Sequence, residues 1–341
     1  MKLINTQDAV GHVLCHDITR IVKDVTKDAA FRKGHVVREE DIPLLLSLGK
    51  EHLYVWENAA GMLHENDAAE ILYQICAGEN MRPSETKEGK IEIIAECDGL
   101  LTIDLERLRA VNSLGEMMIA TRHSGFPVKK GDKLAGTRVI PLVIAGEKMA
   151  RAKEAAGDRP LLRLHPFRPL NAGIVTTGGE VYHGRIKDTF TPVLKEKLAE
   201  FGCGVTEQVV LPDDPAGITA AILGMIGRGA GMILCTGGMS VDPDDRTPLA
   251  IKNTGAEVVS YGAPVLPGAM FLLAYYNGSI PVLGLPGCVM YAKRTIFDIV
   301  LARIAAGLRV TAKELAGLGH GGLCLNCEAC TYPNCGFGKG V

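Results

Sequence analysis

Apolar and polar residues alternate irregularly over the first half of the chain. The stretch 31–57 predicts a turn at Lys33-Gly34, a short strand, a helix starting near Glu39 and a strand over 52–56. Further along, the pattern predicts a helix over 63–77, a β-hairpin turning at Asp98-Gly99, a helix over 104–120, and strands on either side of Gly131-Asp132. Because helices and strands do not alternate regularly, residues 1–150 are typical of a smaller α+β domain.

The pattern changes between residues 151 and 169. An alanine-rich, charged helix ends at Gly157, and three prolines follow before Asn171. Proline restricts both itself and the preceding residue to extended backbone, so this segment predicts a linker between two domains. A second domain over 170–315 and a cysteine-rich tail over 316–341 complete the expected organisation.

From residue 170 onward, apolar runs and amphipathic helices follow one another in regular order. The runs AGIVTTGG and GMILCTGG end in glycine, as buried strands do where they enter a tight turn. Helices are predicted over 188–203 and 215–230, and a long one over 290–306. Strands that alternate with helices of this length pair in parallel through right-handed crossovers. We therefore predict an α/β fold, a three-layer α/β/α arrangement around a mostly parallel sheet.

Three strand ends in this domain carry glycines or acids: TTGGE at 176–180, LPDD at 211–214 and TGGMSVDPDDRTP at 236–248. In a parallel sheet these loops leave the same edge, which is where open α/β sheets bind ligands. Exposed amides favour phosphate, and carboxylates hold Mg²⁺ that bridges phosphate oxygens. Each loop alone is more typical of a solvated turn or helix cap, but the recurrence of three such loops at equivalent strand ends indicates a phosphorylated ligand.

Charge and hydropathy narrow the range of partners. The 37 basic and 39 acidic residues give a formal net charge of -2, so no global field attracts nucleic acid or an anionic membrane. The first residues lack the pattern of a signal peptide, and no apolar stretch approaches the ~18 residues of a membrane helix. A cytoplasmic protein that holds any anionic ligand locally is expected.

The ten cysteines fall into two groups. Six are scattered through apolar surroundings, as expected for buried, reduced thiols: Cys15, Cys76, Cys97, Cys203, Cys235 and Cys288. The other four lie in the tail in the pattern C-x2-C-x2-C-x4-C and are the predicted metal ligands: Cys324, Cys327, Cys330 and Cys335. Their spacing resembles that of a [4Fe-4S] ferredoxin loop with one extra residue before the last cysteine. Four thiolates also make a tetrahedral zinc site, so an Fe-S cluster and Zn²⁺ both remain open.

The segment 236–248 fits the pattern T-G-G-x-x-x-x-P-x-D-x-T-P. In this respect the chain resembles the molybdopterin-binding domain shared by the MogA, MoaB and MoeA families of molybdenum cofactor biosynthesis, over about residues 170–310. The resemblance implies that Asp245 is the family's functional aspartate and that Ser240 matches a serine of the MoeA version. The first loop resembles the family's T-G-x-E, but Gly179 stands where an acid is usual.

Further positions follow from the same resemblance. The sequence LPGCV at 285–289 resembles the L-P-G-N-P turn of MoeA proteins. Three acids are expected in catalytic roles: Asp245, Asp244 and Asp214. The residues expected to bind the ligand are Thr177, Gly178, Gly179, Glu180, Asp188, Asp213, Thr236, Gly237, Gly238, Ser240, Thr247, Pro286 and Gly287.

The resemblance implies Mg²⁺-dependent insertion of molybdate into molybdopterin or adenylated molybdopterin, the work of a molybdopterin molybdotransferase-like enzyme. The alternative is a carrier, chaperone or sensor that holds the cofactor for a molybdoenzyme and catalyses nothing. A nucleotide pyrophosphatase related to the CinA branch of the fold is a third hypothesis. Expected partners are molybdopterin, molybdate and a second copy of the chain, with no nucleic acid and no membrane.

Overall fold

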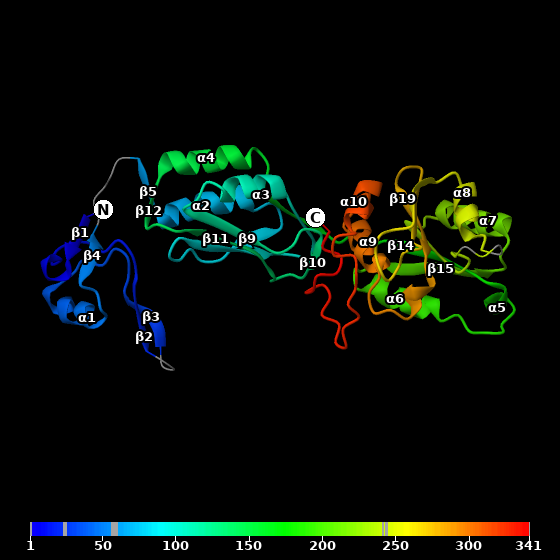
Figure 1. Cartoon of the computed structure of the whole chain (residues 1–341), viewed down its shortest axis with the longest axis horizontal. Helices are drawn as coiled ribbons and strands as arrows, with labels where there is room; N and C mark the ends of the chain where they lie inside the picture. The colour runs from blue at the N-terminus through cyan, green and yellow to red at the C-terminus, as the bar shows by residue number, and fades with distance from the viewer. Residues whose placement is uncertain (1, 23–25, 56–60, 241, 243–244, 341) are drawn as a thin grey trace. The chain divides into compact units, whose positions relative to one another are not determined.

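The computed structural model describes residues 2–22, 26–55, 61–240, 242 and 245–340 of the chain. The chain divides into two compact units, which Figure 1 colours along the sequence. Unit 1 comprises Met1–Glu96, Ile103–Arg122 and Lys130–Arg163; unit 2 comprises Cys97–Thr102, His123–Lys129 and Leu164–Val341. Among the described residues, no helix combines the length and the apolar character needed to cross a bilayer.

The first part of unit 1 is a small cluster of short elements. Its strands are β1 (Lys2–Asn5), β2 (Ile18–Val22), β3 (Thr26–Phe31) and β4 (His52–Val55), and its helices are η1 (Thr6–Asp8), η2 (Glu39–Asp41) and α1 (Ile42–Ser47). β1 pairs with β4 and β2 pairs with β3, both antiparallel. The predicted turn at Lys33-Gly34 and the predicted helix start at Glu39 are both confirmed.

The rest of unit 1 is a four-stranded sheet with helices packed on it. The sheet order is β6 (Met81–Pro83), β7 (Lys90–Ala95), β11 (Lys133–Val139) and β9 (Met117–Thr121). α2 (Glu65–Cys76) packs on this sheet, with α3 (Leu105–Asn112) and α4 (Gly146–Ala156) beside it; β5 (Met62–His64) pairs with β12 (Val143–Ala145). The mixed, non-alternating order is the α+β arrangement expected of this region.

Two predictions in this region are wrong. The strands flanking Asp98-Gly99 form no hairpin, because β7 lies in the four-stranded sheet and β8 (Gly99–Ile103) pairs with β10 (Phe126–Val128) and β13 (Leu162–Pro166). A side chain at Gly99 would collide with the backbone carbonyl of His165, so this glycine serves close strand contact and not a turn.

The helix predicted over 104–120 is also too long. α3 ends at Asn112, and Gly115 and Glu116 then adopt positive φ angles of 72° and 62° before β9 begins. The Asn112 side chain accepts a hydrogen bond from the Ile119 amide at 2.8 Å and donates to the Ile119 carbonyl at 2.9 Å. These two hydrogen bonds fix β9 next to the end of α3, in the part of the chain where the pattern predicted that the helix continues.

The segment 151–169, expected as a linker, contains regular structure. α4 extends to Ala156, and Gly157 follows it with φ 70°. β13 then runs from Leu162 to Pro166, and unit 2 resumes at Leu164.

Unit 2 contains a six-stranded sheet in the order β15 (Gly204–Leu211), β14 (Asn171–Thr177), β16 (Met232–Thr236), β19 (Ile280–Leu285), β18 (Leu272–Tyr276) and β17 (Glu257–Tyr261). The first four strands are parallel to one another, β18 runs antiparallel to β19, and β17 runs antiparallel to β18 and so in the direction of the first four. The predicted mostly parallel sheet is therefore confirmed, with β18 as the one described strand of this sheet that runs against the others.

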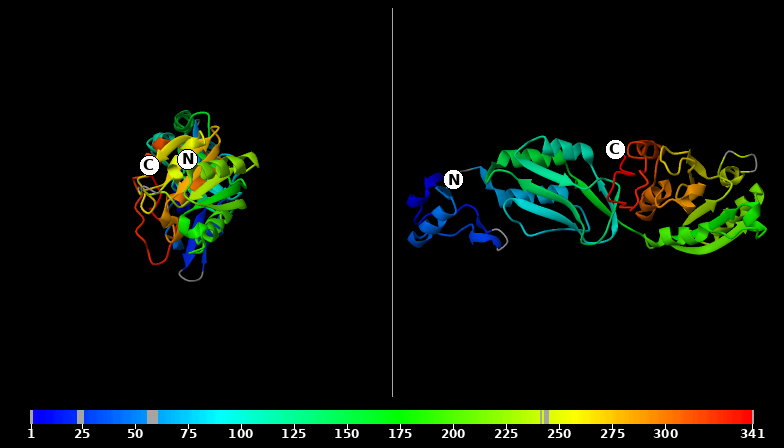
Figure 2. Two further views of the ribbon diagram at one scale, coloured as in Figure 1. Left: turned by 90° about the vertical axis from the view of Figure 1, so that its right-hand side faces the viewer. Right: turned by 60° about the horizontal axis from the view of Figure 1, so that its bottom comes forward.

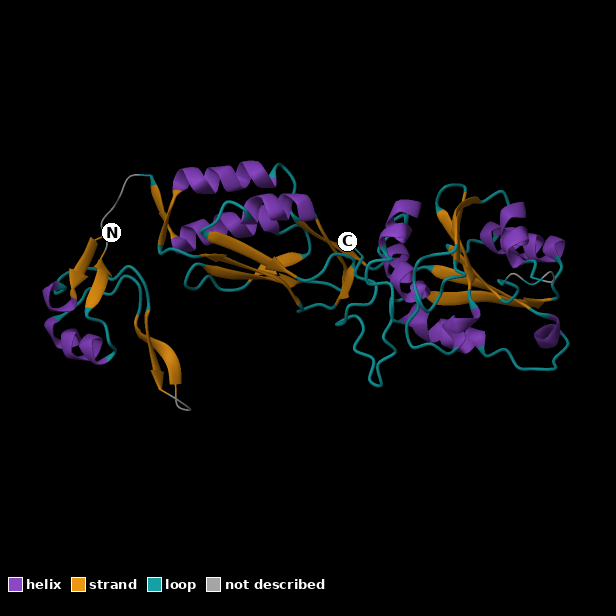
Figure 3. Cartoon of the chain, in the orientation of Figure 1, coloured by secondary structure: helices purple, strands orange, loops and turns teal. Residues whose placement is uncertain are grey.

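The two faces of this sheet pack against different helices, which Figure 3 shows as separate layers. Ile174 and Leu234 lie in one cluster with α6 (Phe190–Ala199), α9 (Ile296–Ala305) and α10 (Ala312–Gly317). Val175 and Cys235, the next residues of the same strands, lie in the other with α7 (Pro215–Gly227) and α8 (Thr247–Asn253). Strand alternation thus produces the predicted three layers.

The long helix predicted over 290–306 is shorter than expected. Residues Gly287–Met290 form a 3-10 turn, η3, and α9 begins only at Ile296. Thr295 and Asp298 make a capping box at this point, because the Thr295 hydroxyl accepts from the Phe297 amide and Asp298 accepts from the Thr295 amide. The intervening residues, 291–294, lead from the turn to the helix.

Candidate functional site

The carboxyl ends of the four parallel strands lie at one edge of the sheet in unit 2. Thr177 at the end of β14 is paired with Leu211 at the end of β15. Thr236 at the end of β16 is paired with Thr176 and with Leu285, the last residue of β19. The loops that carry the predicted site residues therefore leave the same edge, as the sequence predicted; this edge is named the strand-end rim below.

At the centre of the strand-end rim, buried threonines pack against the turn formed by Gly237 and Gly238. The Thr247 hydroxyl donates to the Gly237 carbonyl at 2.9 Å and lies 3.2 Å from the Thr177 hydroxyl. Gly237 and Gly238 have φ angles of 84° and 55°, and a side chain at Gly237 would collide with the Thr177 carbonyl. Thr236 donates to Thr176 at 3.3 Å. Only glycine fits this turn, which presents half-exposed backbone at the rim.

The first loop of the rim is tied to the second by a carboxylate. Gly178 has φ 131° and precedes the short helix α5 (Gly179–Tyr182). The Gly179 amide donates to Asp213 Oδ2 at 3.1 Å. Gly179 was expected to bind the ligand, but its amide already donates to a carboxylate. Glu180 is exposed, and its carboxylate lies close to Gly178.

Two of the predicted acids cap helices. Asp214 accepts hydrogen bonds from the Ala216 and Gly217 amides at the start of α7. Asp188 accepts from the Phe190 and Thr191 amides, from the Thr191 hydroxyl at 2.6 Å and from Gln208 Nε2 at 2.9 Å. Both carboxylates therefore stabilise the starts of helices, and this role explains their positions without a ligand.

The acidic loop after β16 carries Asp245 beside a tyrosine that the sequence did not single out. Tyr261, the last residue of β17, donates its hydroxyl to the Met239 carbonyl at 2.9 Å. Burial and the nearby charge of Asp245 raise the pKa of Tyr261. Asp245 is half-buried, its amide donates to the Asp242 carbonyl at 2.9 Å, and Ser240 is exposed. Asp244, predicted to be catalytic, lies outside the described residues.

The turn after β19 contributes two further predicted residues. Pro286 is buried and precedes η3, whereas Gly287 is exposed and has open space where a side chain would stand. Cys288 follows, half-buried, and burial raises the pKa of its thiol.

Two exposed basic residues that the sequence analysis did not single out follow the first loop. Arg185 and Lys187 are exposed in the segment between α5 and α6, and the Arg185 amide donates to the Glu180 carbonyl at 2.9 Å. The pattern RIK shortly after the first glycine loop was the available signal, because cations near glycine turns suit an anionic ligand.

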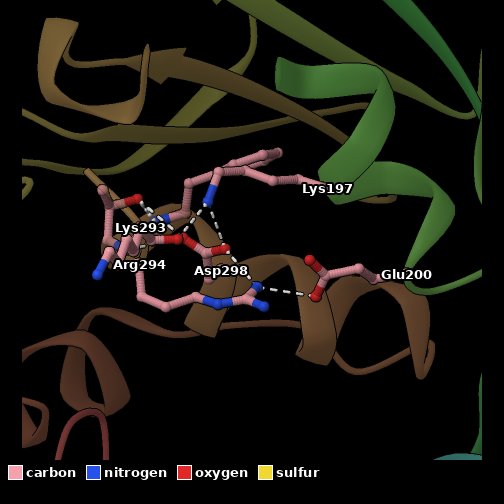
Figure 4. Close-up of polar contacts among 7 residues, drawn as sticks. Lys197, Glu200, Lys293, Arg294 and Asp298 are labelled. Carbon is pink, nitrogen blue, oxygen red and sulfur yellow. Dashed lines mark hydrogen bonds and ion pairs between the residues drawn. The ribbon is translucent and has the colours of Figure 1, made fainter. Parts of the chain in front are cut away.

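A buried ion network in unit 2 connects α6 with the start of α9 (Figure 4). Lys197 Nζ donates to Asp298 Oδ1 at 2.7 Å, and the two side chains are only 8% and 1% exposed. Lys197 also donates to the Lys293 carbonyl at 3.1 Å, and Arg294 pairs with both Asp298 and Glu200. These charges raise the pKa of Arg294, so it stays cationic. The sequence offered no signal for a pair 101 residues apart.

The four tail cysteines are free thiols that line a common cavity of about 210 Å³. In the part of the chain that the structure describes, no three His, Cys, Asp or Glu residues are arranged to hold a single metal ion. The structure thus brings the four predicted ligands together without forming a mononuclear site.

Two family models match the chain. The model described as "Probable molybdopterin binding domain" matches residues 173–306, and a "Domain of unknown function (DUF8806)" matches residues 3–57. The solved structure of the molybdopterin biosynthesis enzyme MoaB from Thermus thermophilus is 22% identical and covers 40% of this chain and 89% of its own, with a TM-score of 0.32.

Two relatives carry the name molybdopterin molybdenumtransferase. The one from Synechococcus elongatus is 27% identical over 163 residues, which are 45% of this chain and 38% of the relative. The one from Haemophilus influenzae is 24% identical over 319 residues, 89% of this chain and 72% of the relative. The chain thus spans well under half of the first relative and nearly three quarters of the second. Residues 173–306 form a domain of the molybdopterin-binding family, on the α/β fold that the strand order of unit 2 displays.

Proposed function

We propose that the chain acts in molybdenum cofactor biosynthesis, as a molybdopterin molybdotransferase-like enzyme that inserts molybdate into molybdopterin or its adenylated form. The observation that carries this proposal is the strand-end rim within the molybdopterin-binding domain. There the Gly237-Gly238 turn is locked against Thr177 and Thr247 at the carboxyl ends of four parallel strands. A turn without side chains lets a ligand's phosphate approach the backbone closely.

Charge at the rim supports an anionic ligand. Arg185 and Lys187 are exposed in the segment that follows the first loop, while the chain as a whole is close to neutral. Local positive charge attracts a phosphate that the net charge of the protein does not attract. The pterin phosphate or pyrophosphate is therefore assigned to the rim.

Magnesium is assigned to the acidic loop after β16. Asp245 is half-buried, and its charge acts on Tyr261 across the rim. Mg²⁺ prefers carboxylate and phosphate oxygens and retains several waters, so one or two carboxylates suffice to hold it beside a phosphate. Asp245 and its neighbour Asp244 are the proposed protein ligands. The metal would orient the phosphate and neutralise charge that develops on it.

A non-catalytic cofactor carrier is the second candidate. The Asp213 carboxylate already accepts a hydrogen bond from the Gly179 amide, and Asp214 caps α7. These contacts leave fewer carboxylates for metal chemistry than the sequence predicted. A carrier needs only the phosphate cradle and not the metal ligands.

Release of AMP distinguishes the two candidates. The purified protein, mixed with adenylated molybdopterin, Mg²⁺ and molybdate, is expected to release AMP. Asp245→Asn is expected to lower the rate at least ~100-fold, because it removes a metal ligand and its negative charge. Glu257→Gln, which alters an exposed carboxylate paired with Arg309, is the matched control and should retain the wild-type rate.

Each outcome of these assays bears on a different part of the proposal. Retention of the adenylated pterin without AMP release would replace the enzyme by the carrier. Wild-type turnover by Asp245→Asn would contradict the assigned metal site. Asp214→Asn preserves a capping side chain, so full activity in that variant would assign Asp214 to helix capping alone.

A further inference from the structure

The C-terminal tail, red in the right-hand view of Figure 2, packs against α9 and α10 of unit 2. Phe337 is buried, and side chains at Gly338 and Gly340 would stand 2.7 Å from Ile299 and 2.6 Å from the Gly317 carbonyl. The Cys324 amide donates to the Leu266 carbonyl at 2.8 Å. The cysteine loop is therefore held at both of its ends by the body of unit 2.

The four cysteines of this loop share one cavity. Cys324, Cys327, Cys330 and Cys335 all line the space of about 210 Å³, and all four are free thiols. Two are half-buried and two are exposed, so the cavity opens to solvent on one side. Because a loop of twelve residues brings every one of its thiols to a single cavity, a shared ligand accounts for the arrangement better than four independent residues do.

Cations and aromatic rings form the rest of the cavity wall. Lys293 Nζ donates to the Glu328 carbonyl at 2.6 Å and to the Cys327 carbonyl at 3.4 Å. Arg294 lies over the Tyr332 ring, 5.1 Å from its centroid, and is fixed by Asp298 and Glu200. The wall thus places positive charge beside the thiols, with an apolar ring on the inner side.

We propose that this cavity binds a [4Fe-4S] cluster through Cys324, Cys327, Cys330 and Cys335. Four cysteine thiolates are the usual ligands of such clusters. Four thiolates outweigh the charge of the cluster core, so the bound group is an anion, which the charges of Lys293 and Arg294 stabilise. This inference does not depend on the function proposed for the strand-end rim.

The order of the cysteines along the chain favours a cluster over zinc. In zinc ribbons the ligands come as two separated pairs, whereas Cys324, Cys327 and Cys330 follow one another at equal intervals, as in ferredoxin loops. All four cysteines line one cavity, which is the space assigned to the cluster.

Cluster binding is a ligand exchange without a change of oxidation state. Each thiol gives up its proton to solvent, and its sulfur then forms one bond to iron in place of a thiolate ligand of a preassembled [4Fe-4S]²⁺ cluster. The displaced thiolate takes up the proton. Four iron–sulfur bonds break and four form.

Metal analysis tests the proposal. The full-length protein, incubated anaerobically with a synthetic thiolate-ligated [4Fe-4S] cluster and then desalted, is expected to be brown and to hold about four irons and four sulfides per chain. A parallel sample offered Zn²⁺ alone should retain less than one equivalent. Colourless protein after cluster treatment, or one tightly held zinc per chain, would overturn the proposal.

Serine variants assign the ligands. Cys327→Ser and Cys330→Ser are exposed changes and should each lower iron retention several-fold, with an unchanged circular dichroism spectrum. Cys97→Ser, outside the tail, is the matched control and should bind iron as the wild type does. Equal iron retention in Cys327→Ser, Cys330→Ser and Cys97→Ser would contradict the assignment.

The reduction potential of the bound cluster tests whether Lys293 stabilises its negative charge. Lys293→Met removes a positive charge beside the cluster, so reduction becomes less favourable and the potential shifts to a more negative value. Lys313→Met, an exposed change on α10, should leave it unchanged. A potential that does not differ between these two variants would remove Lys293 from the site.

Discussion

Replacing Asp298 by alanine is expected to lower the free energy of unfolding by about 3–5 kcal/mol. The carboxylate is 1% exposed and accepts from Lys197, from Arg294 and from the Thr295 amide. Its removal leaves the ammonium of Lys197, itself 8% exposed, without its anionic partner inside the protein. It also removes half of the capping box at the start of α9. Urea denaturation followed by circular dichroism measures the loss.

Two further variants separate the causes. Glu257→Ala breaks an exposed ion pair with Arg309 and should cost less than about 1 kcal/mol. Lys197→Met in the Asp298→Ala background removes the buried charge and should restore part of the lost stability. If Asp298→Ala and Glu257→Ala destabilise the protein equally, the buried ion network does not have the assigned role.

Gly237→Ala is expected to have the second largest effect, about 3 kcal/mol of lost stability together with loss of pterin binding. Gly237 has φ 84°, which costs an alanine about 1–2 kcal/mol by itself. In addition, the new methyl group would collide with the Thr177 carbonyl and approach the Thr177 hydroxyl to 2.8 Å. That collision must push apart the loops that follow β14 and β16.

Gly255→Ala isolates the contribution of the backbone angle. Gly255 has φ 82°, nearly the same as Gly237, but nothing lies within 4 Å of an added methyl group. Its replacement should cost about 1 kcal/mol and leave binding unchanged. Thermal unfolding and pterin fluorescence titration compare the two. Identical results for both alanines would mean that the packing of Gly237 against Thr177 is unimportant.

The fold of unit 2 could be predicted because its pattern is local. Ile174 and Val175 alternate between two helix layers, and the buried strands β14 and β16 both lead into glycine turns. Parallel pairing then follows from chain order, and the convergence of the loops follows from parallel pairing. The reversed direction of β18 could be predicted less directly. No helix separates β18 from β17 or from β19 along the chain, so the pattern gives no crossover from which to infer its direction.

Other features depended on residues distant in sequence. Gly99 has the pattern of a hairpin turn, yet it serves the approach of the His165 backbone. Lys197 lies in an amphipathic helix like any solvated lysine, and only Asp298, far along the chain, makes it a buried partner. Asp213 and Asp214 were recognised as acids at a strand end. Whether an acid caps a helix or faces a ligand depends on side-chain direction, which composition does not encode.

A crystal structure with bound molybdopterin and Mg²⁺ tests the central claim most directly. The proposed binding mode predicts the terminal phosphate at the strand-end rim, about 3 Å from backbone amides of the Gly237-Gly238 turn. It also predicts Mg²⁺ between that phosphate and the Asp245 carboxylate. A pterin bound away from the carboxyl ends of β14 and β16, or a phosphate held without either glycine, would contradict it.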